Sequence, residues 1–302
     1  MKKKYDPSDE VQRTLAVAIV GLPRFYDVLL PKLLKNFRAV GASIAVMFWR
    51  YSNKNIPQTN TLHLRVPIDQ DDWDALADFG FDRAIFAEPI DDVVIEHPHV
   101  DHPQVRQLSL SPKATASFSW ITAVAHGASI LEELDPGHAA AFWLICRPDI
   151  RLSKLSLARL LKKLSRDANF KESSIVTAAR PTAHKVLKTS SGEQNLPIDH
   201  FFLGSPQAIL KLRELTSQLD NIKTGKDTRQ PIVNEFILGQ FFVDRELTEF
   251  PVRLPYIIWR GNWAKSIGAN GRTGLSKVVQ ISNSLEWQAI SYAKPGLHKA
   301  GM

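Results

Sequence analysis

Residues 140–150 read Ala-Ala-Phe-Trp-Leu-Ile-Cys-Arg-Pro-Asp-Ile, and this stretch decides the fold class. It begins as an apolar run with no polar interruption. Such a run is typical of a strand that is buried on both faces, as in a parallel sheet between two layers of helices. Pro148 cannot donate to a sheet ladder and favours an extended conformation at Arg147, so we expect the strand to end there.

Two charged side chains, Arg147 and Asp149, therefore follow the end of a central strand. Open α/β sheets bind their ligands at the carboxyl edge of the strands. Asp149 offers hard oxygen atoms to a divalent cation, and Arg147 offers forked donors to a phosphate. The alternative is a strand that ends in a surface Arg–Asp pair without any ligand, because a lone Asp after a strand is common.

Composition narrows the classes of protein that fit the chain. A hydrophobic content of 44% over 302 residues is enough for a sizeable core. No apolar run approaches the ~20 residues that a membrane helix needs, and the basic N-terminus lacks the apolar segment of a signal peptide. Cys146 is the only cysteine, which excludes an intramolecular disulfide and a Cys-based zinc site. We therefore expect a cytoplasmic protein.

The net charge of +7 favours anionic partners, such as phosphates, nucleotides, acidic glycans or the inner membrane surface. The basic residues are scattered along the chain, with no basic run interleaved with aromatic residues. We therefore expect no nucleic-acid partner.

Strand patterns and helix patterns alternate along most of the chain, and there is no internal repeat. This alternation predicts an α/β fold with one mainly parallel central sheet flanked by helices. We expect a single domain over 1–302, with a nucleotide-binding half at 13–110 and a metal and acceptor half at 111–302. The predicted strands are 15–20, 43–49, 62–66, 84–87, the apolar run from 140 that ends at Arg147, 174–179, 198–203 and 254–259. The predicted helices are 24–37, 114–134, 151–166, 206–219 and 232–245.

The first predicted strand ends at Gly21, which is followed by Pro23 and Arg24. Gly21 allows a tight turn or the close approach of a ligand to the backbone, and Pro23 suits a first helical turn. Nucleotide-binding α/β domains begin with such a strand, glycine turn and helix. One glycine also fits an ordinary turn between a strand and a helix.

The predicted helix at 151–166 carries a leucine stripe and six basic residues with no acid among them. One hypothesis is a basic amphipathic helix on an anionic membrane surface. The other, which we favour, is a helix that covers the core and exposes a solvated basic face.

Polar candidates occur near three later elements. Asp199 and His200 lie in the predicted strand 198–203, Ser205 is placed as the N-cap of the following helix, and Glu235 lies in the first turn of the helix 232–245. Helix-dipole stabilisation by Glu235 and a capping role for Asp199 are sufficient structural explanations. The histidine-rich stretch 97–102 lies between prolines, and we interpret it as a solvated loop rather than a metal site.

Taken in order, several motifs resemble the bacterial and algal families of polysaccharide glycosyltransferases with a GT-A-like nucleotide-sugar domain, including the WavE type of lipopolysaccharide-synthesis protein. The resemblance spans about residues 15 to 260. It rests on the stretches Val-Gly-Leu-Pro-Arg at 20–24, Arg-Pro-Asp at 147–149, Asp-His-Phe-Phe-Leu-Gly at 199–204 and Asn-Glu-Phe-Ile-Leu at 234–238.

The resemblance implies transfer of a sugar from a nucleotide-diphosphate donor to a surface polysaccharide or lipid-linked glycan. Gly21, Arg24 and Arg147 are the expected donor-binding residues. Asp149 would stand where GT-A enzymes carry the second acid of the Asp-x-Asp motif, while Arg147 replaces the first. Either Asp149, with His298 as a further ligand, holds Mn²⁺ or Mg²⁺, or Arg147 itself offsets part of the diphosphate charge.

The expected catalytic residues, which would accept the proton of the acceptor hydroxyl, are Asp199, Glu235 and His200. A second hypothesis is a catalytically inactive GT-A-like protein that binds glycans or a partner enzyme, which the missing first acid favours. The third is a nucleic-acid binder.

Overall fold

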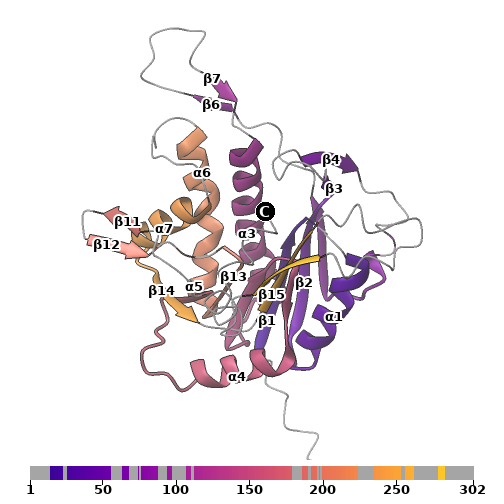
Figure 1. Cartoon of the computed structure of the whole chain (residues 1–302). Helices are drawn as coiled ribbons and strands as arrows, with labels where there is room; N and C mark the ends of the chain where they lie inside the picture. The colour runs from indigo at the N-terminus through magenta and orange to yellow at the C-terminus, as the bar shows by residue number, and fades with distance from the viewer. Residues whose placement is uncertain are drawn as a thin grey trace, which may run out of the picture.

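The computed structural model describes residues 14–22, 26–55, 63–67, 74, 76–87, 94–96, 107–109, 112–178, 186–189, 192–195, 197, 199–223, 234–252, 256–261 and 278–282. Its centre is a seven-stranded sheet with helices on both faces (Figure 1). The strands follow in the order β14 (Thr248–Val252), β10 (Ser174–Ala178), β13 (Phe201–Gly204), β8 (Phe142–Cys146), β1 (Leu15–Gly21), β2 (Ser43–Trp49) and β5 (Arg83–Ala87).

The sheet is mainly parallel. Every neighbouring pair is parallel except the two pairs that β13 forms, with β8 and with β10. The α/β class predicted from the sequence is therefore confirmed. The sheet takes β1, β2 and β5 from residues 13–110 and the other four strands from residues 111–302. The division of the chain into two functional halves stays a prediction.

The central strands are apolar throughout because both of their faces are covered. All seven residues of β1 are buried. Successive side chains point to opposite faces of a strand, so Ala16, Ala18 and Val20 enter one hydrophobic cluster. Leu15, Val17 and Ile19 enter the other. A strand with this double burial has no room for the polar alternation of a half-exposed strand.

Two layers of helices cover the sheet. Four helices contribute to one cluster: α3 (Pro112–Leu134), α5 (Pro206–Lys211), α6 (Leu215–Lys223) and α7 (Asn234–Asp244). Two helices contribute to the other: α1 (Tyr26–Arg38) and α4 (Lys154–Leu164). On α3, Gly127 faces the sheet, where a Cβ would lie 2.8 Å from Val20 Cγ1. The lack of a side chain at Gly127 thus lets α3 pack closely against β1.

Short antiparallel pieces surround the main sheet. They are β3 (Tyr51–Asn55) with β4 (His63–Pro67), β6 (Val94–Glu96) with β7 (Gln107–Ser109), β11 (Val186–Thr189) with β12 (Gly192–Asn195), and β9 (Ile150–Leu152) with β15 (Tyr256–Gly261) and β16 (Val278–Ser282). Two of these hairpins contain strands where the sequence predicts none, at 51–55 and at 186–195. Pairing with a neighbouring strand stabilises β3 and β12, although their sequences, Tyr-Ser-Asn-Lys-Asn and Gly-Glu-Gln-Asn, lack the apolar pattern of strands.

The predicted end of the central strand at Arg147 is confirmed, because β8 ends at Cys146 and the chain turns at Pro148 and Asp149 before β9. Two other predicted boundaries differ from the structure. The strand predicted at 198–203 begins only at Phe201, and the helix predicted at 206–219 is interrupted by a 3-10 turn at Leu212–Glu214. The Ser205 N-cap is confirmed, since its hydroxyl accepts a hydrogen bond of 3.0 Å from the backbone N–H of Ala208.

The sequence of α4 left open whether its leucine stripe faces a membrane or the core. Its leucine stripe is buried in the core: Leu157, Leu160, Leu161 and Leu164. The favoured hypothesis of a covering helix is thus confirmed, and the apolar face of α4 is not available for insertion into a membrane. Within the described part of the chain, no helix is long and apolar enough to span a bilayer.

Candidate functional site

The carboxyl end of β1 is Gly21, which has a positive φ of 110°. An L-residue with a side chain rarely adopts this conformation, so the turn out of the strand requires glycine. A Cβ added here would lie 3.5 Å from Cζ3 of Trp120 on α3. Gly21 therefore lies beside an aromatic ring at the sheet edge where ligands of open α/β sheets bind.

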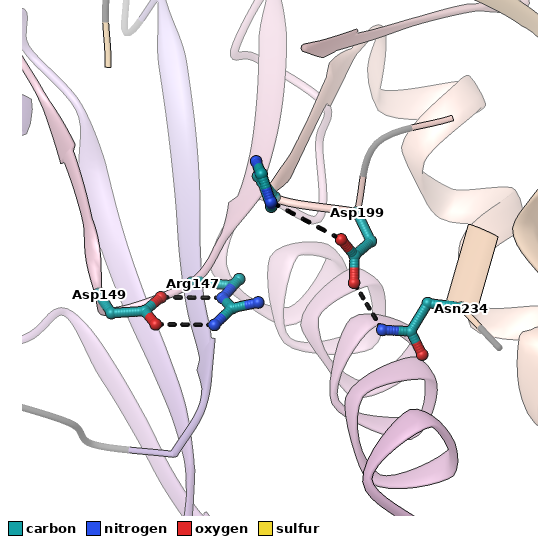
Figure 2. A network of polar contacts seen from close by, with 5 residues as sticks. Arg147, Asp149, Asp199 and Asn234 are labelled. Carbon is teal, nitrogen blue, oxygen red and sulfur yellow. Dashed lines mark hydrogen bonds and ion pairs between the residues drawn. The ribbon is translucent and has the colours of Figure 1, made fainter. Parts of the chain in front are cut away.

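Arg147 and Asp149 form a bidentate ion pair just past the end of β8 (Figure 2). Arg147 Nε donates to Asp149 Oδ1 at 2.8 Å, and Nη2 donates to Oδ2 at 2.7 Å. The side chain of Asp149 is only 1% exposed, whereas that of Arg147 is 17% exposed. The carboxylate thus lies on the inner side of the pair, and the guanidinium is the member that solvent and ligands can reach.

This geometry differs from the expectation that Asp149 faces an open cleft. Both of its carboxylate oxygens accept hydrogen bonds from the guanidinium and the side chain is only 1% exposed, so a divalent cation could reach the remaining lone pairs only if this region opened. Among the described residues, no three His, Cys, Asp or Glu side chains lie together in a group that could hold a metal ion. The described residues therefore include no preformed cluster of metal ligands around Asp149, and His298, the other predicted ligand, lies outside them. A metal-ligand role for Asp149 stays a prediction.

The buried carboxylate of Asp149 also acts on its neighbour, Cys146. Burial raises the pKa of the Cys146 thiol, and the negative charge of Asp149 raises that pKa further. The thiol is fully buried. Cys146 is therefore a core residue rather than a nucleophile, because reactive cysteines are exposed thiolates of lowered pKa.

Trp120 connects β1 and β8 on the α3 side. The Cζ of Arg147 lies 5.6 Å from the centroid of the Trp120 ring, a cation–π distance. The indole Nε1–H is buried without a hydrogen-bond partner. A guanidinium that is fixed by a carboxylate and stacked on an indole is held in one orientation, as the recognition of a phosphate requires.

A second polar group lies next to this pair. In the antiparallel pairing of β8 with β13, Phe201 lies opposite Cys146, so His200 and Arg147 are the next residues beyond that pair. Asp199 and His200 form the turn that leads into β13. Figure 2 shows the Arg147 guanidinium on the side of Asp149 that faces Asp199 and Asn234.

Asp199 is held by the first residue of α7. Asn234 Nδ2 donates to Asp199 Oδ2 at 2.5 Å, and His200 Nε2 lies 3.9 Å from Asp199 Oδ1. The side chains of Asp199 and His200 are each 15% exposed. Asn234 Oδ1 is buried and has no hydrogen-bond partner. An amide that donates to a carboxylate necessarily turns its oxygen elsewhere, so Asn234 Oδ1 is an acceptor suited to a ligand hydroxyl or amine.

The remaining predicted site residues have different outcomes. Glu235 is half-buried in the first turn of α7, next to Asn234 in the chain, so it belongs to the same region as Asp199. Arg24 and His298 lie outside the described residues, as does the stretch 97–102. The structure thus brings Gly21, Arg147, Asp199 and His200 to one edge of the sheet, although it tests none of their roles.

Sequence analysis missed two participants, Trp120 and Asn234. Trp120 lies inside a long helix, where an aromatic residue is ordinarily part of the core. Asn234 was noted only as part of a helix start, and its bond to Asp199 joins residues 35 positions apart. No local pattern indicates such a pairing, although an Asn next to Glu235 at the start of a helix was a possible signal.

No family model matches the chain, and no curated protein sequence matches it. A search of solved structures finds mouse xyloside xylosyltransferase 1 in its apo form. The match has a TM-score of 0.38 and 9% sequence identity, and it covers 78% of this chain and 84% of the other. The resemblance to the WavE-type family therefore stays a prediction.

Proposed function

We propose that this protein is a glycosyltransferase that transfers a sugar from a nucleotide-diphosphate donor to a surface polysaccharide or lipid-linked glycan. The observation that supports the proposal is the position of Arg147. Its guanidinium is stacked on Trp120, oriented by Asp149 and partly exposed at the carboxyl edge of a mainly parallel sheet. Asp199 lies two residues before Phe201, the β13 residue that pairs with Cys146 of β8, so its carboxylate is at the same edge of the sheet.

In this proposal Arg147 binds the diphosphate of the donor. When the bond between the sugar C1 and the diphosphate oxygen breaks, negative charge develops on the leaving group, and a preorganised guanidinium stabilises it. Gly21 allows the donor to approach the backbone at the end of β1. Arg24 and His298 stay predicted members of the site.

The acceptor side of the reaction is assigned to the Asp199 region. As the acceptor oxygen bonds to C1, its hydroxyl proton passes to a base, for which Asp199 is the first choice and Glu235 and His200 are the others. Asn234 would orient Asp199 through its Nδ2–H and accept from a sugar hydroxyl through Oδ1.

A thermal-shift experiment on the full chain with UDP-, GDP- and CMP-sugars tests the donor class. A donor that binds only the folded state raises the melting temperature, because saturation at about 100 times Kd adds about 2.7 kcal/mol to the free energy of unfolding. We expect Arg147→Lys to lose this shift, since a lysine cannot form the forked bonds of the guanidinium. Arg159→Lys on the exposed face of α4 is the matched control and should keep the shift. If no nucleotide sugar changes the melting temperature of the wild type, the proposal is wrong.

One observation favours a second candidate, a catalytically inactive protein of this fold that binds glycans or a partner enzyme. The carboxylate expected to serve the metal is engaged by Arg147 on both oxygens. The two candidates differ in turnover. Under the first, the donor that raises the melting temperature is also slowly hydrolysed or transferred, and Asp199→Asn abolishes this. Under the second, binding occurs with no release of nucleotide in either protein.

A further inference from the structure

The solvent-facing side of α4 is a cationic surface. Arg159 and Lys162 lie on α4 and are exposed, Arg166 is exposed in the turn just after the helix, and Leu155 continues the same stripe one turn before Arg159. Lys163 lies next to Lys162 and is exposed as well. Leu155 is 58% exposed and is the one large hydrophobic side chain so exposed among the described residues.

The surface is rigidly supported. The opposite face of α4 is the buried leucine stripe described above. The Ser153 side chain caps the helix start by accepting from the backbone N–H of Ser156 at 3.1 Å. The basic side chains therefore project from a fixed helix and do not require a segment to fold on binding.

These cations are not neutralised by the protein. They line an open groove of about 530 Å³ together with Asp167 and Ala168. Within the described part of the chain, none of Arg159, Lys162, Lys163 and Arg166 takes part in an ion pair. One acid, Asp167, faces four bases, so the groove keeps a net positive charge.

We propose that this surface of α4 binds the anionic headgroups of a phospholipid membrane. Each basic side chain near such a surface adds an electrostatic attraction, which acts over about one Debye length. Leu155, at one end of the stripe, can enter the headgroup boundary, while the buried leucine stripe excludes deeper insertion. The stripe contains no aromatic residue on which a nucleic-acid base could stack, so a lipid surface fits it better.

The position of α4 has a consequence for the acceptor. Asn36, in the last turn of α1, donates a 2.7 Å hydrogen bond to the carbonyl of Leu152, just before α4 begins. Since α1 returns from the carboxyl end of β1 to the start of β2, this contact places the start of α4 near the amino edge of the sheet, and Figure 1 shows α4 across that end. Docking through α4 would therefore hold Arg147 roughly 20 Å or more from the headgroups, the length of a seven-residue strand at ~3.3 Å per residue. A lipid-linked acceptor would have to carry a glycan long enough to span this distance.

Co-sedimentation of the full chain with vesicles tests the proposal. We expect binding to vesicles of phosphatidylcholine mixed with phosphatidylglycerol, little binding to phosphatidylcholine alone, and weaker binding as salt increases. The variant Lys162→Glu/Arg166→Glu should bind anionic vesicles at least about tenfold more weakly. Leu155→Ser should cause a smaller loss.

The matched control is Lys32→Glu/Lys35→Glu on α1, which changes net charge equally at two exposed positions of the same helical layer. It should retain vesicle binding within about twofold of the wild type. Equal loss in the control would show that net charge alone is responsible, and it would overturn the proposal. Equal binding to neutral vesicles would overturn it too, as would displacement by inorganic phosphate but not by chloride of the same ionic strength. None of these outcomes depends on nucleotide-sugar binding, so the test stands apart from the proposed function.

Discussion

Asp149 and Asp199 are two carboxylates at one edge of the same sheet, and they differ in burial and in their hydrogen-bond partners. Asp149 is 1% exposed and gives both oxygens to one guanidinium. Asp199 is 15% exposed, accepts from Asn234 on one oxygen and has its other oxygen 3.9 Å from an imidazole nitrogen. The first carboxylate orients a neighbour, whereas the second remains within reach of a ligand.

The difference shows that distance from a strand end does not determine which acid is chemically available. A buried carboxylate needs a fully bonded partner, because leaving it uncompensated is strongly unfavourable. Asp149 is the buried member of the pair, and its partner Arg147 is the member that is partly exposed. The positive charge nearest the end of β8 is that of Arg147, and the carboxylate that stays partly exposed lies in the turn before the adjacent antiparallel strand β13.

The largest expected effect is on stability. Arg147→Met leaves the buried Asp149 carboxylate without its guanidinium, and we expect the free energy of unfolding in urea to fall by about 3–5 kcal/mol. The double variant Arg147→Met/Asp149→Leu removes both charges and should recover most of this loss. A single variant within about 1 kcal/mol of the wild type would mean that the pair is weakly coupled, and the contrast with Asp199 would then disappear.

The next effect is on turnover. Asp199→Asn keeps the shape of the side chain and an acceptor for Asn234, but it removes the base. We expect kcat for transfer or donor hydrolysis to fall at least about 100-fold, with the melting temperature and donor-induced shift unchanged. Asp199→Glu should restore part of the activity. If Asp199→Asn remains within about threefold of wild type, the base is another residue, and Glu235 is the next to be tested.

A smaller effect is expected from metal removal. Because both Asp149 oxygens are bonded to Arg147, donor binding should be the same within about twofold with Mn²⁺ or with EDTA. Isothermal titration of the donor identified by thermal shift measures this directly. Binding that requires Mn²⁺ would show that the ion pair opens in the complex and that Asp149 is available after all.

A last prediction concerns the thiol next to Asp149, which takes no part in the proposed reaction. Burial and the Asp149 charge both raise the pKa of Cys146, so the thiolate is scarce at neutral pH. We expect a maleimide to label Cys146 at least about 100-fold more slowly in the native protein than in urea. Rapid labelling of the native chain would show that the Cys146–Asp149 region opens easily, contrary to a closed ion pair.

Much of the fold could be predicted from local patterns. The apolar runs at 15–20 and 43–49 correspond to β1 and β2, and the Ser205 cap marks the start of α5 as predicted. The hairpin at 186–195 and the strand β14 were missed. Their polar or mixed sequences become strands through pairing with neighbours, which no window of sequence contains.

The candidate site could likewise be predicted only where a local sequence pattern marks its residues. Arg147, Asp149 and Asp199 could be identified because each lies next to an apolar stretch that ends at a proline or a turn. Trp120 and Asn234 could not, since they reach the site from α3 and α7 through contacts between distant parts of the chain.

The sequence by itself determined that this chain forms a mainly parallel α/β sheet with charged residues at strand ends, because side-chain periodicity and proline geometry act locally. Only the tertiary structure decided which of those charges faces inward. Arg147 and Asp149 are two residues apart in any conformation. The packing of Trp120 against Gly21, and the burial of Asp149 beneath the guanidinium, fix the orientation of that pair and leave Arg147 as its more exposed member.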